Sequence, residues 1–311
     1  MESAVLELKN VHKKIGGKHI IKDVSFSIQE GEVFGFIGPN GAGKTTTIRM
    51  IVGLMKITSG DILLSGKSIQ TDFKAAVQNI GAIVENPELY PFMTGMQNLK
   101  QFARMTPGIS KERIEEVIKL VRLEKAIHEK VQKYSLGMKQ RLGIAQALLH
   151  EPKVLILDEP TNGLDPSGMR EIREYIRHIA KEDQVAVIIS SHLLSEIELM
   201  CDRIGIIKNG SLIATRPVHI EGDTSISSTD KLSQVAMEIS EIDRAIQLIR
   251  KKSSMEVKRV NGQLHLQIEK EKVPSIISEF VENDIKIYQV IVSKATLEDT
   301  FLELIGENII G

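Results

Sequence analysis

Residues 38–45 read GPNGAGKT, and this stretch decides the fold. It follows the apolar run Val33 to Ile37, which predicts a buried strand, and it opens a predicted helix that runs to about Leu54. In the pattern G-x-x-x-x-G-K-[ST], the glycines let successive backbone N–H groups turn toward one anion without Cβ clashes. Lys44 would then reach the β- and γ-phosphates of a nucleotide, and the Thr45 hydroxyl would reach Mg²⁺. A plain glycine-rich turn is the alternative, and the strand and helix around the stretch count against it.

Two acidic residues end a second apolar run. Residues 154–157, VLIL, predict another buried strand, and Asp158 and Glu159 follow it directly. Ligands of open α/β sheets bind at the carboxyl ends of the strands. Asp158 fits a metal ligand that acts through water, and Glu159 fits the group that polarises an attacking water. Acids that cap a helix are the alternative, and the phosphate loop upstream counts against it.

Two further apolar runs, Val185 to Ile189 and Ile204 to Ile207, complete a set of unalternating segments with helical stretches between them. Strands covered by helices on both faces have this pattern, so the sequence predicts a largely parallel α/β sheet. From about residue 87 to 150 the pattern is mostly helical, which predicts a helical insert. Residues 217–231 are rich in Ser, Thr, Gly and Asp, so we expect a linker there and a first domain over residues 1–216.

A second domain is expected over residues 232–311. Its pattern gives strand, helix, strand, strand, helix and strand in turn, with the last strand expected at Ile285 to Val292. Asn261-Gly262 predicts a hairpin between the middle strands. This is the ferredoxin-like α+β order. A final helix is predicted at residues 297–304. The order alone assigns no function to the domain, because this small fold has many functions.

Composition counts against several classes of protein. The 311 residues exceed one ordinary domain, and the charges cancel to a net charge of −1, so no overall basic field argues for nucleic acid. The single cysteine, Cys201, fits a reducing compartment and is expected to be a core residue rather than a nucleophile. Met1-Glu2-Ser3 begins no basic-then-apolar leader, and no apolar run approaches the roughly 20 residues of a membrane helix. We therefore expect a cytosolic chain.

Residues 135–140, SLGMKQ, open another predicted helix, with Ser135 as its N-cap. Alone, this is a capped helix. Placed fourteen residues before the strand at 154–158, in a chain with a phosphate loop, it resembles the signature of ABC transporters. The chain is identified as a member of the ATP-binding-cassette family, and the resemblance extends from about Val5 to Thr215. It implies a P-loop NTPase fold with a helical subdomain and antiparallel N-terminal strands.

The resemblance implies roles for the positions that match the family's motifs. The nucleotide-binding residues would be Gly38, Pro39, Asn40, Gly41, Ala42, Gly43, Lys44, Thr45 and Thr46, with Ile15 against the base. The signature would comprise Ser135, Leu136, Gly137, Met138, Lys139 and Gln140. The remaining roles would be those of catalytic residues (Glu159 and His192), metal ligands (Thr45, Asp158 and Glu85) and the D-loop (Asp165). A lone histidine at a strand end is more often structural, so only its family position favours a catalytic His192.

In this family the signature acts across a dimer interface. Ser135 and Gly137 of one copy would complete the ATP site of another, so one cassette per chain implies a second cassette, and we expect a homodimer. Bound ATP and Mg²⁺ would hold the two cassettes together. Hydrolysis would let them separate and drive a partner protein.

Three features depart from the family's usual residues. Met138-Lys139 departs from the commonest signature, LSGGQ. Ile15 stands where an aromatic residue often stacks on adenine, and it offers less contact area. Glu85, in the stretch GAIVENPELYPFM at 81–93, stands where the family has a glutamine. A triphosphate repels a carboxylate beside it unless Mg²⁺ or a positioned water lies between them, or the two are far apart. The alternative is that Glu85 is a solvated acid near the start of a helix.

The apolar residues Tyr90 to Met93 follow Glu85 in the predicted insert, and they fit either a core or a docking surface. By resemblance, this region would hold the coupling helix of a separately encoded membrane permease. The stretch at 81–99 and the C-terminal TLEDTFLELIG are similar to the bacitracin and lantibiotic resistance branch, which exports peptide antibiotics. We therefore expect a cytoplasmic chain bound peripherally to the inner face of the cell membrane. The alternatives are a soluble ATPase that acts on ribosomes or DNA, and a regulatory module that hydrolyses ATP poorly.

Overall fold

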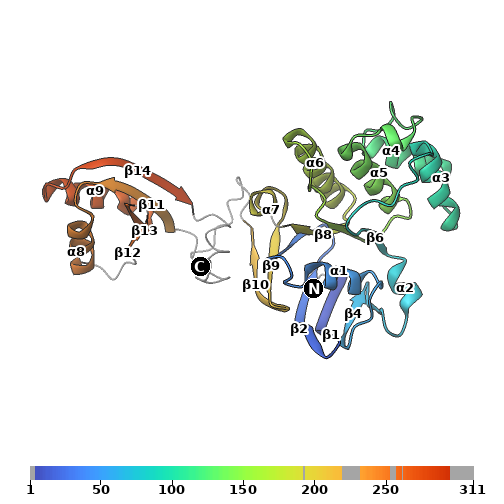
Figure 1. Cartoon of the computed structure of the whole chain (residues 1–311), viewed down its shortest axis with the longest axis horizontal. Coiled ribbons are helices and arrows are strands. Elements are labelled where there is room, and N and C mark those ends of the chain that lie inside the picture. The colour runs from blue at the N-terminus through green and yellow to red at the C-terminus, as the bar shows by residue number, and fades with distance from the viewer. Residues whose placement is uncertain (1–3, 192, 219–231, 253–256, 261, 295–311) are drawn as a thin grey trace. The chain divides into compact units, whose positions relative to one another are not determined.

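The computed structural model describes residues 4–191, 193–218, 232–252, 257–260 and 262–294. The chain divides into two compact units, Met1–Ile220 and Glu221–Gly311 (Figure 1). Each unit has a hydrophobic core of its own. Within the described ranges, no helix is long and apolar enough to cross a bilayer.

The central sheet of the first unit has the strand order β10-β9-β3-β8-β7-β6. Neighbouring strands from β9 to β6 are parallel, and β10 runs antiparallel to β9. Because β3, β7 and β8 are buried at every position, the predicted covered strands of a parallel α/β sheet are confirmed. The bounds are β3 Val33–Ile37, β6 Ile80–Ile83, β7 Val154–Asp158, β8 Ala186–Ser191, β9 Arg203–Lys208 and β10 Ser211–Pro217.

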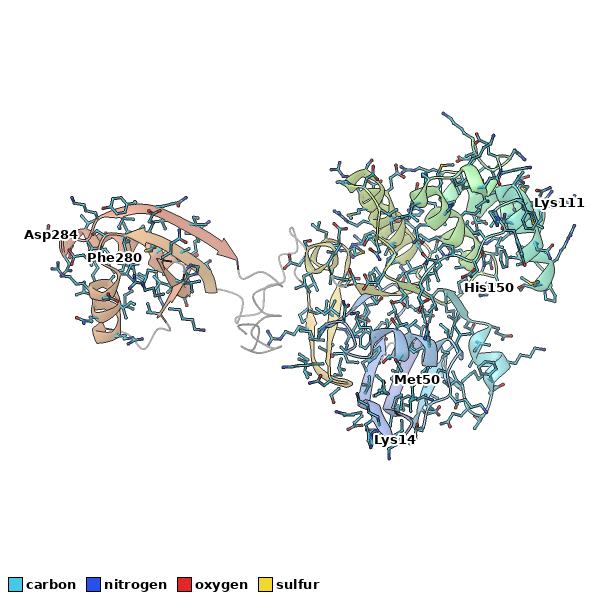
Figure 2. The ribbon with its side chains drawn as sticks, viewed as in Figure 1. Lys14, Met50, Lys111, His150, Phe280 and Asp284 are labelled. Atoms are coloured by element: carbon cyan, nitrogen blue, oxygen red, sulfur yellow. The ribbon has the colours of Figure 1, made fainter. Side chains whose placement is uncertain are left out.

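A second sheet, in the order β2-β1-β4-β5, confirms the predicted antiparallel N-terminal strands. Its core is shared with the central sheet and with helix α1. Phe26 of β2 stacks on Phe34 of β3 with ring centroids 5.0 Å apart, and Met50 of α1 is completely buried (Figure 2). The bounds are β1 Leu6–Ile15, β2 Lys18–Ile28, β4 Ser59–Leu64, β5 Lys67–Ser68 and α1 Lys44–Ile51.

Three α-helices between β6 and β7 form the predicted helical insert: α3 (Gly95–Met105), α4 (Lys111–Leu120) and α5 (Leu136–Leu148). Each begins after a hydroxyl side chain, Thr94, Ser110 or Ser135, that accepts a hydrogen bond from the backbone N–H three residues on. The predicted N-cap at Ser135 is therefore confirmed. Helices α6 (Pro166–Glu182) and α7 (Leu194–Met200) pack on the central sheet at β3 and β8, and α2 (Phe73–Val77) packs on β4 and β5 of the second sheet.

The second unit confirms the ferredoxin-like prediction. Its sheet has the order β12-β13-β11-β14, and all neighbours are antiparallel. Phe280 of α9 is completely buried in this core (Figure 2). The bounds are β11 Leu232–Ile239, α8 Ile242–Lys252, β12 Val257–Val260, β13 Gln263–Glu269, α9 Val273–Glu282 and β14 Ile287–Lys294. The helix predicted at 297–304 lies outside the described residues.

Candidate functional site

The stretch GPNGAGKT connects β3 to α1, as its sequence predicts. A Cβ atom at Gly38 would lie 2.3 Å from the Ile207 carbonyl oxygen, and Gly43 has a φ of 114° directly before α1. Both positions therefore require glycine, one for lack of space and the other for its backbone conformation. The loop ends at the N-terminus of α1, where free backbone N–H groups and the helix dipole favour an anion.

Lys44 lies mostly buried at the start of α1. Its Nζ donates a hydrogen bond to the Gly38 carbonyl oxygen at 2.6 Å. Burial lowers the pKa of the Lys44 ammonium below its usual value, and the negative charges of Glu159 and Asp158 partly oppose that shift. The structure thus brings the predicted lysine of the loop within electrostatic range of both predicted acids.

Asp158, the last residue of β7, is 3% exposed. The Ser190 hydroxyl, from the neighbouring strand β8, donates a hydrogen bond to Asp158 Oδ1. The same hydroxyl accepts a hydrogen bond from the Glu159 backbone N–H at 3.1 Å. Ser190 therefore fixes both acids at the carboxyl edge of the sheet. Sequence reasoning missed this serine, although its place at the end of the third apolar run was a usable signal.

The residues at this edge fit Mg²⁺. At nucleotide sites Mg²⁺ is held by one or two protein oxygens together with phosphates and waters. The Thr45 hydroxyl at the start of α1 and the buried, hydrogen-bonded Asp158 carboxylate are of this kind. In the part of the chain that the structure describes, no group of three or more His, Cys, Asp or Glu side chains could hold a metal ion.

Glu85 lies just after β6, in the left-handed backbone region with φ 66°. Its carboxylate is 59% exposed, and Arg49 Nη2 donates to Glu85 Oε1 at 2.5 Å. Arg49 stands in the last turn of α1, four residues after Thr45. This ion pair was not expected from the sequence, and the metal-binding role of Glu85 remains a prediction.

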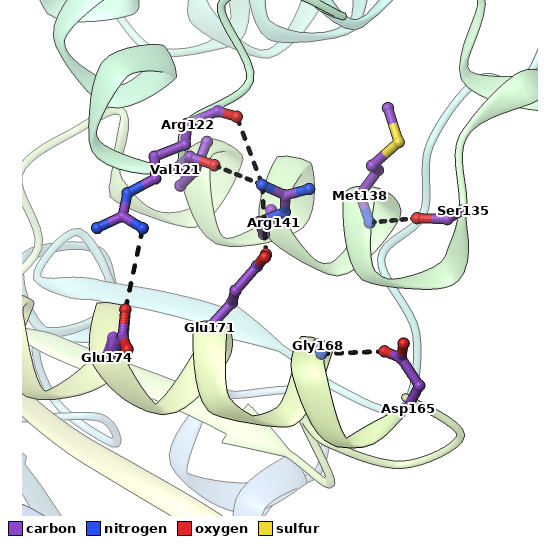
Figure 3. A network of polar contacts seen from close by, with 9 residues as sticks. All are labelled: Val121, Arg122, Ser135, Met138, Arg141, Asp165, Gly168, Glu171 and Glu174. Carbon is purple, nitrogen blue, oxygen red and sulfur yellow. Dashed lines mark hydrogen bonds and ion pairs between the residues drawn. The ribbon is translucent and has the colours of Figure 1, made fainter.

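The signature and the D-loop lie against each other within one chain (Figure 3). A Cβ atom at Gly163 would lie 3.0 Å from Leu136 Cδ2, and one at Gly137 would lie 3.8 Å from Leu164 Cδ2. Asp165 Oδ1 accepts a hydrogen bond from the Gly168 N–H at 2.9 Å and caps α6. The two predicted motifs therefore begin two neighbouring helices, α5 and α6.

Two predicted site residues are not brought to this edge by any described contact. Ile15 ends β1, is about half exposed and precedes the turn at Gly16 and Gly17. Its contact with a base remains a prediction. His192 lies outside the described residues.

Three aromatic side chains form a surface cluster in the insert, which we call the aromatic cluster: Tyr90, Phe92 and Phe102. The Tyr90 ring centroid lies 6.0 Å from that of Phe92 and 6.4 Å from that of Phe102. Phe92 is 62% exposed. The sequence left a core and a docking surface as alternatives for this segment. The exposure of Phe92 favours the docking surface.

Comparisons with known proteins agree with this geometry. The family model described as ABC transporter matches residues 21–162. The ABC transporter ATP-binding protein YhcH of Bacillus subtilis (strain 168) is 54% identical over 307 residues, 97% of this chain and 96% of the relative. The bacitracin transport ATP-binding protein BcrA of Bacillus licheniformis is 38% identical over 312 residues, 99% of this chain and 100% of the relative.

A solved structure extends the likeness to the fold. It is a dimeric ATP-binding cassette in a post-hydrolysis state, bound to ADP and Pi. Its TM-score is 0.61 at 27% identity, and the match covers 69% of this chain and 99% of that chain. The resemblance predicted from the motifs, to ABC cassettes and to the bacitracin branch among them, is therefore confirmed. The chain belongs to the ABC-transporter family, as an ATP-binding subunit that hydrolyses ATP.

Proposed function

We propose that the chain powers export of a peptide antibiotic, of the bacitracin or lantibiotic kind, through a separately encoded membrane permease. Such export would give the cell resistance or immunity. The observation that carries this proposal is the likeness to a bacitracin transport ATP-binding protein over 99% of this chain, the second unit included. A likeness limited to the cassette would have argued for ATP hydrolysis alone.

The geometry supports a direct role for the chain's own residues in hydrolysis. The loop N–H groups and Lys44 bind the phosphates, and Thr45 and Asp158 would hold Mg²⁺, which would supply positive charge to offset the charge of the phosphates. Ser190 keeps Asp158 and Glu159 in place through its two hydrogen bonds. Glu159 orients the attacking water, a role that fits its place near Lys44 at the phosphate-binding edge. His192, by its position in the family's motif order, is the residue proposed to act at the γ-phosphate.

Two copies of the chain form the working unit. The N-terminus of α5, with Ser135 and Gly137, binds the γ-phosphate on the partner copy, so each site needs both chains. The dimeric arrangement of the solved cassette, which holds ADP and Pi, supports this proposal. ATP stabilises the closed dimer, and hydrolysis weakens it.

The aromatic cluster docks the permease. Tyr90 and Phe92 of the cluster follow Glu85 by five and seven residues, so a movement at the nucleotide edge would reach the docking surface through a short segment. Exposed aromatic side chains are enriched in protein interfaces. The chain is therefore cytoplasmic and peripheral, held at the inner face of the membrane by its partner.

The experiment replaces the chain by its Glu159→Gln variant in the native host and measures growth under bacitracin and under a lantibiotic. The proposal expects hypersensitivity to at least one of them. A matched Leu199→Ala variant, at an exposed position of α7, should keep resistance. Unchanged growth of the Glu159→Gln strain under both antibiotics, at equal protein levels, would contradict the proposal. Purification from membranes with an unrelated polytopic protein is the second expected result.

A further inference from the structure

Arg141 connects the signature helix α5 to two neighbouring helices (Figure 3). Its Nη1 donates to the carbonyl oxygens of Val121 and Arg122, both at 3.4 Å, at the end of α4. The same Nη1 lies 3.6 Å from Glu171 Oε2 on α6. Arg141 also follows Gly137 by four residues, so the two lie on the same face of α5, one turn apart. A side chain that holds this face of α5 in position therefore also holds the signature residues in position.

Two pockets that open to solvent lie at the junction of these helices. One, of about 360 Å³, is lined by Arg122, Met138 and Arg141 together with residues 123–126. The other, of about 400 Å³, is lined by Arg122 with Glu174 and Tyr175 of α6. Arg122 and Arg141 therefore stand where the side-chain packing between α4, α5 and α6 is interrupted, and their polar contacts bridge these helices.

Among those contacts, Arg141 is the best enclosed. Its side chain is 17% exposed, whereas the Arg122 side chain is 67% exposed. Arg122 Nη1 lies 3.9 Å from Glu174 Oε2, and its guanidinium lies 5.6 Å from the Tyr175 ring centroid. Ion pairs that water surrounds contribute little. Arg141, with two carbonyl acceptors, one ion pair and less solvent, is therefore the better candidate for fixing the angle of α5.

Glu171 connects the Arg141 contact to the D-loop. It stands on α6, the helix that Asp165 of the D-loop caps. Two contacts therefore join the signature helix α5 to the D-loop and α6. One is the contact between Leu136 and Gly163 at the start of the helices, and the other is the Arg141–Glu171 pair further along them. A signature held in this way moves with the D-loop of its own chain.

We propose that Arg141 is a positioning residue for ATP hydrolysis. It sets the angle of α5 through Glu171 and the end of α4, and so places Ser135 and Gly137 at the γ-phosphate of the partner copy. Arg141 itself touches no nucleotide. The inference rests on the proposed dimer, in which the signature acts on the partner's site, and it goes beyond it by naming the side chain that controls the signature's position.

The first test compares four variants by ATP turnover and by binding of a fluorescent ATP analogue. Arg141→Gln should lower kcat by about ten- to a hundredfold, the scale expected when a reacting group is misplaced by an ångström. Binding should stay unchanged, because the variant's own phosphate loop is intact. Arg141→Lys should recover part of the rate, because it keeps a cation for Glu171. Glu171→Gln should lower kcat in the same direction, and Arg170→Gln, at an exposed position of α6, should not.

The second test uses mixed dimers purified with two different tags. In the first dimer, one copy carries Lys44→Ala and the other carries Arg141→Gln, so the remaining phosphate loop faces an intact signature. In the second dimer, one copy carries both substitutions, so the remaining loop faces the altered signature. The proposal expects hydrolysis in the first dimer and much less in the second.

Equal rates in the two mixed dimers, or a higher rate in the second, would overturn the proposal, since a defect in folding or in the variant's own site would produce them. A wild-type dimer without ATPase activity, or one that Lys44→Ala leaves active, would instead refute the proposed function. The two failures are therefore distinguishable.

Discussion

Arg49 and Glu85 join the phosphate-loop helix α1 to the end of β6 through an ion pair, with Nη2 and Oε1 2.5 Å apart. Thr45 and Arg49 are four residues apart on α1, so they lie on one face about 5–6 Å apart at their Cβ atoms. The pair therefore holds the Glu85 carboxylate about one helical turn along α1 from the threonine proposed to bind Mg²⁺. Release from Arg49 would free both Glu85 oxygens for that metal.

Glu85→Gln should keep ATP binding and shift the Mg²⁺ concentration at which ATPase activity is half maximal. Arg49→Gln should lower that concentration, because it releases the carboxylate. Both side chains are well exposed, so the ion pair contributes about 0.2–1 kcal/mol and the shift stays below about tenfold. Magnesium titrations of both variants measure it. An unchanged titration for both would place Glu85 outside the coordination shell and favour the solvated acid.

Ser190→Ala should lower ATPase activity and destabilise the fold. The substitution leaves the buried Asp158 carboxylate without the hydroxyl donor, which costs about 1–3 kcal/mol in the free energy of unfolding, whereas the Glu159 N–H keeps the Ser190 carbonyl oxygen as an acceptor. Urea denaturation and steady-state kinetics measure the two effects. Ser191→Ala is the matched control, because Ser191 is also buried but accepts from the Leu193 N–H. An ATPase rate and a free energy of unfolding no lower in Ser190→Ala than in Ser191→Ala would contradict the role of Ser190 in holding Asp158.

Phe92→Ala should leave the ATPase activity of the purified chain unchanged and reduce its recovery with membranes. The side chain is largely exposed, so its removal disturbs little of the core, while the docking surface loses an aromatic residue. Sedimentation of lysates from the native host, followed by detection of the chain, measures the change. Leu199→Ala, at a position 52% exposed, controls for loss of any exposed apolar side chain. The same membrane-bound fraction in both variants would remove the aromatic cluster from the docking surface.

Cys201 should resist alkylation in the folded chain. The side chain is completely buried, and burial raises the pKa of the thiol well above its ordinary value, so almost no thiolate forms at neutral pH. After treatment with a maleimide, mass spectrometry should find the Cys201 thiol unmodified in the folded chain in buffer and modified in the chain unfolded by guanidinium chloride. Rapid modification of the native chain would contradict its place in the core.

Much of the cassette could be predicted because its elements depend on short patterns. The phosphate loop, the three buried strands and the cap at Ser135 each follow from adjacent residues whose chemistry specifies one local structure. The limits of elements were harder to predict. The last strand of the second unit was expected at residues 285–292, but β14 spans Ile287–Lys294. Ile285 is apolar because it packs in the core before the strand begins.

Contacts between distant segments could not be predicted. The Arg49–Glu85 pair requires the positive φ of Glu85 and the approach of α1 to the end of β6, and neither leaves a local pattern. The same holds for Arg141, whose acceptors come from α4 and α6. These side chains look like ordinary surface charges in the sequence, and only the packing of the helices gives them partners.

The measurement that tests the account most directly is the mass of the Glu159→Gln variant by light scattering, with ATP and with ADP. If Glu159 orients the attacking water and the signature of one copy binds the γ-phosphate on the other, the variant hydrolyses no ATP and forms a stable dimer with ATP. It stays monomeric with ADP, while the wild-type chain dimerises only transiently. Turnover at the wild-type rate, or a mass that ATP does not change, would contradict the account.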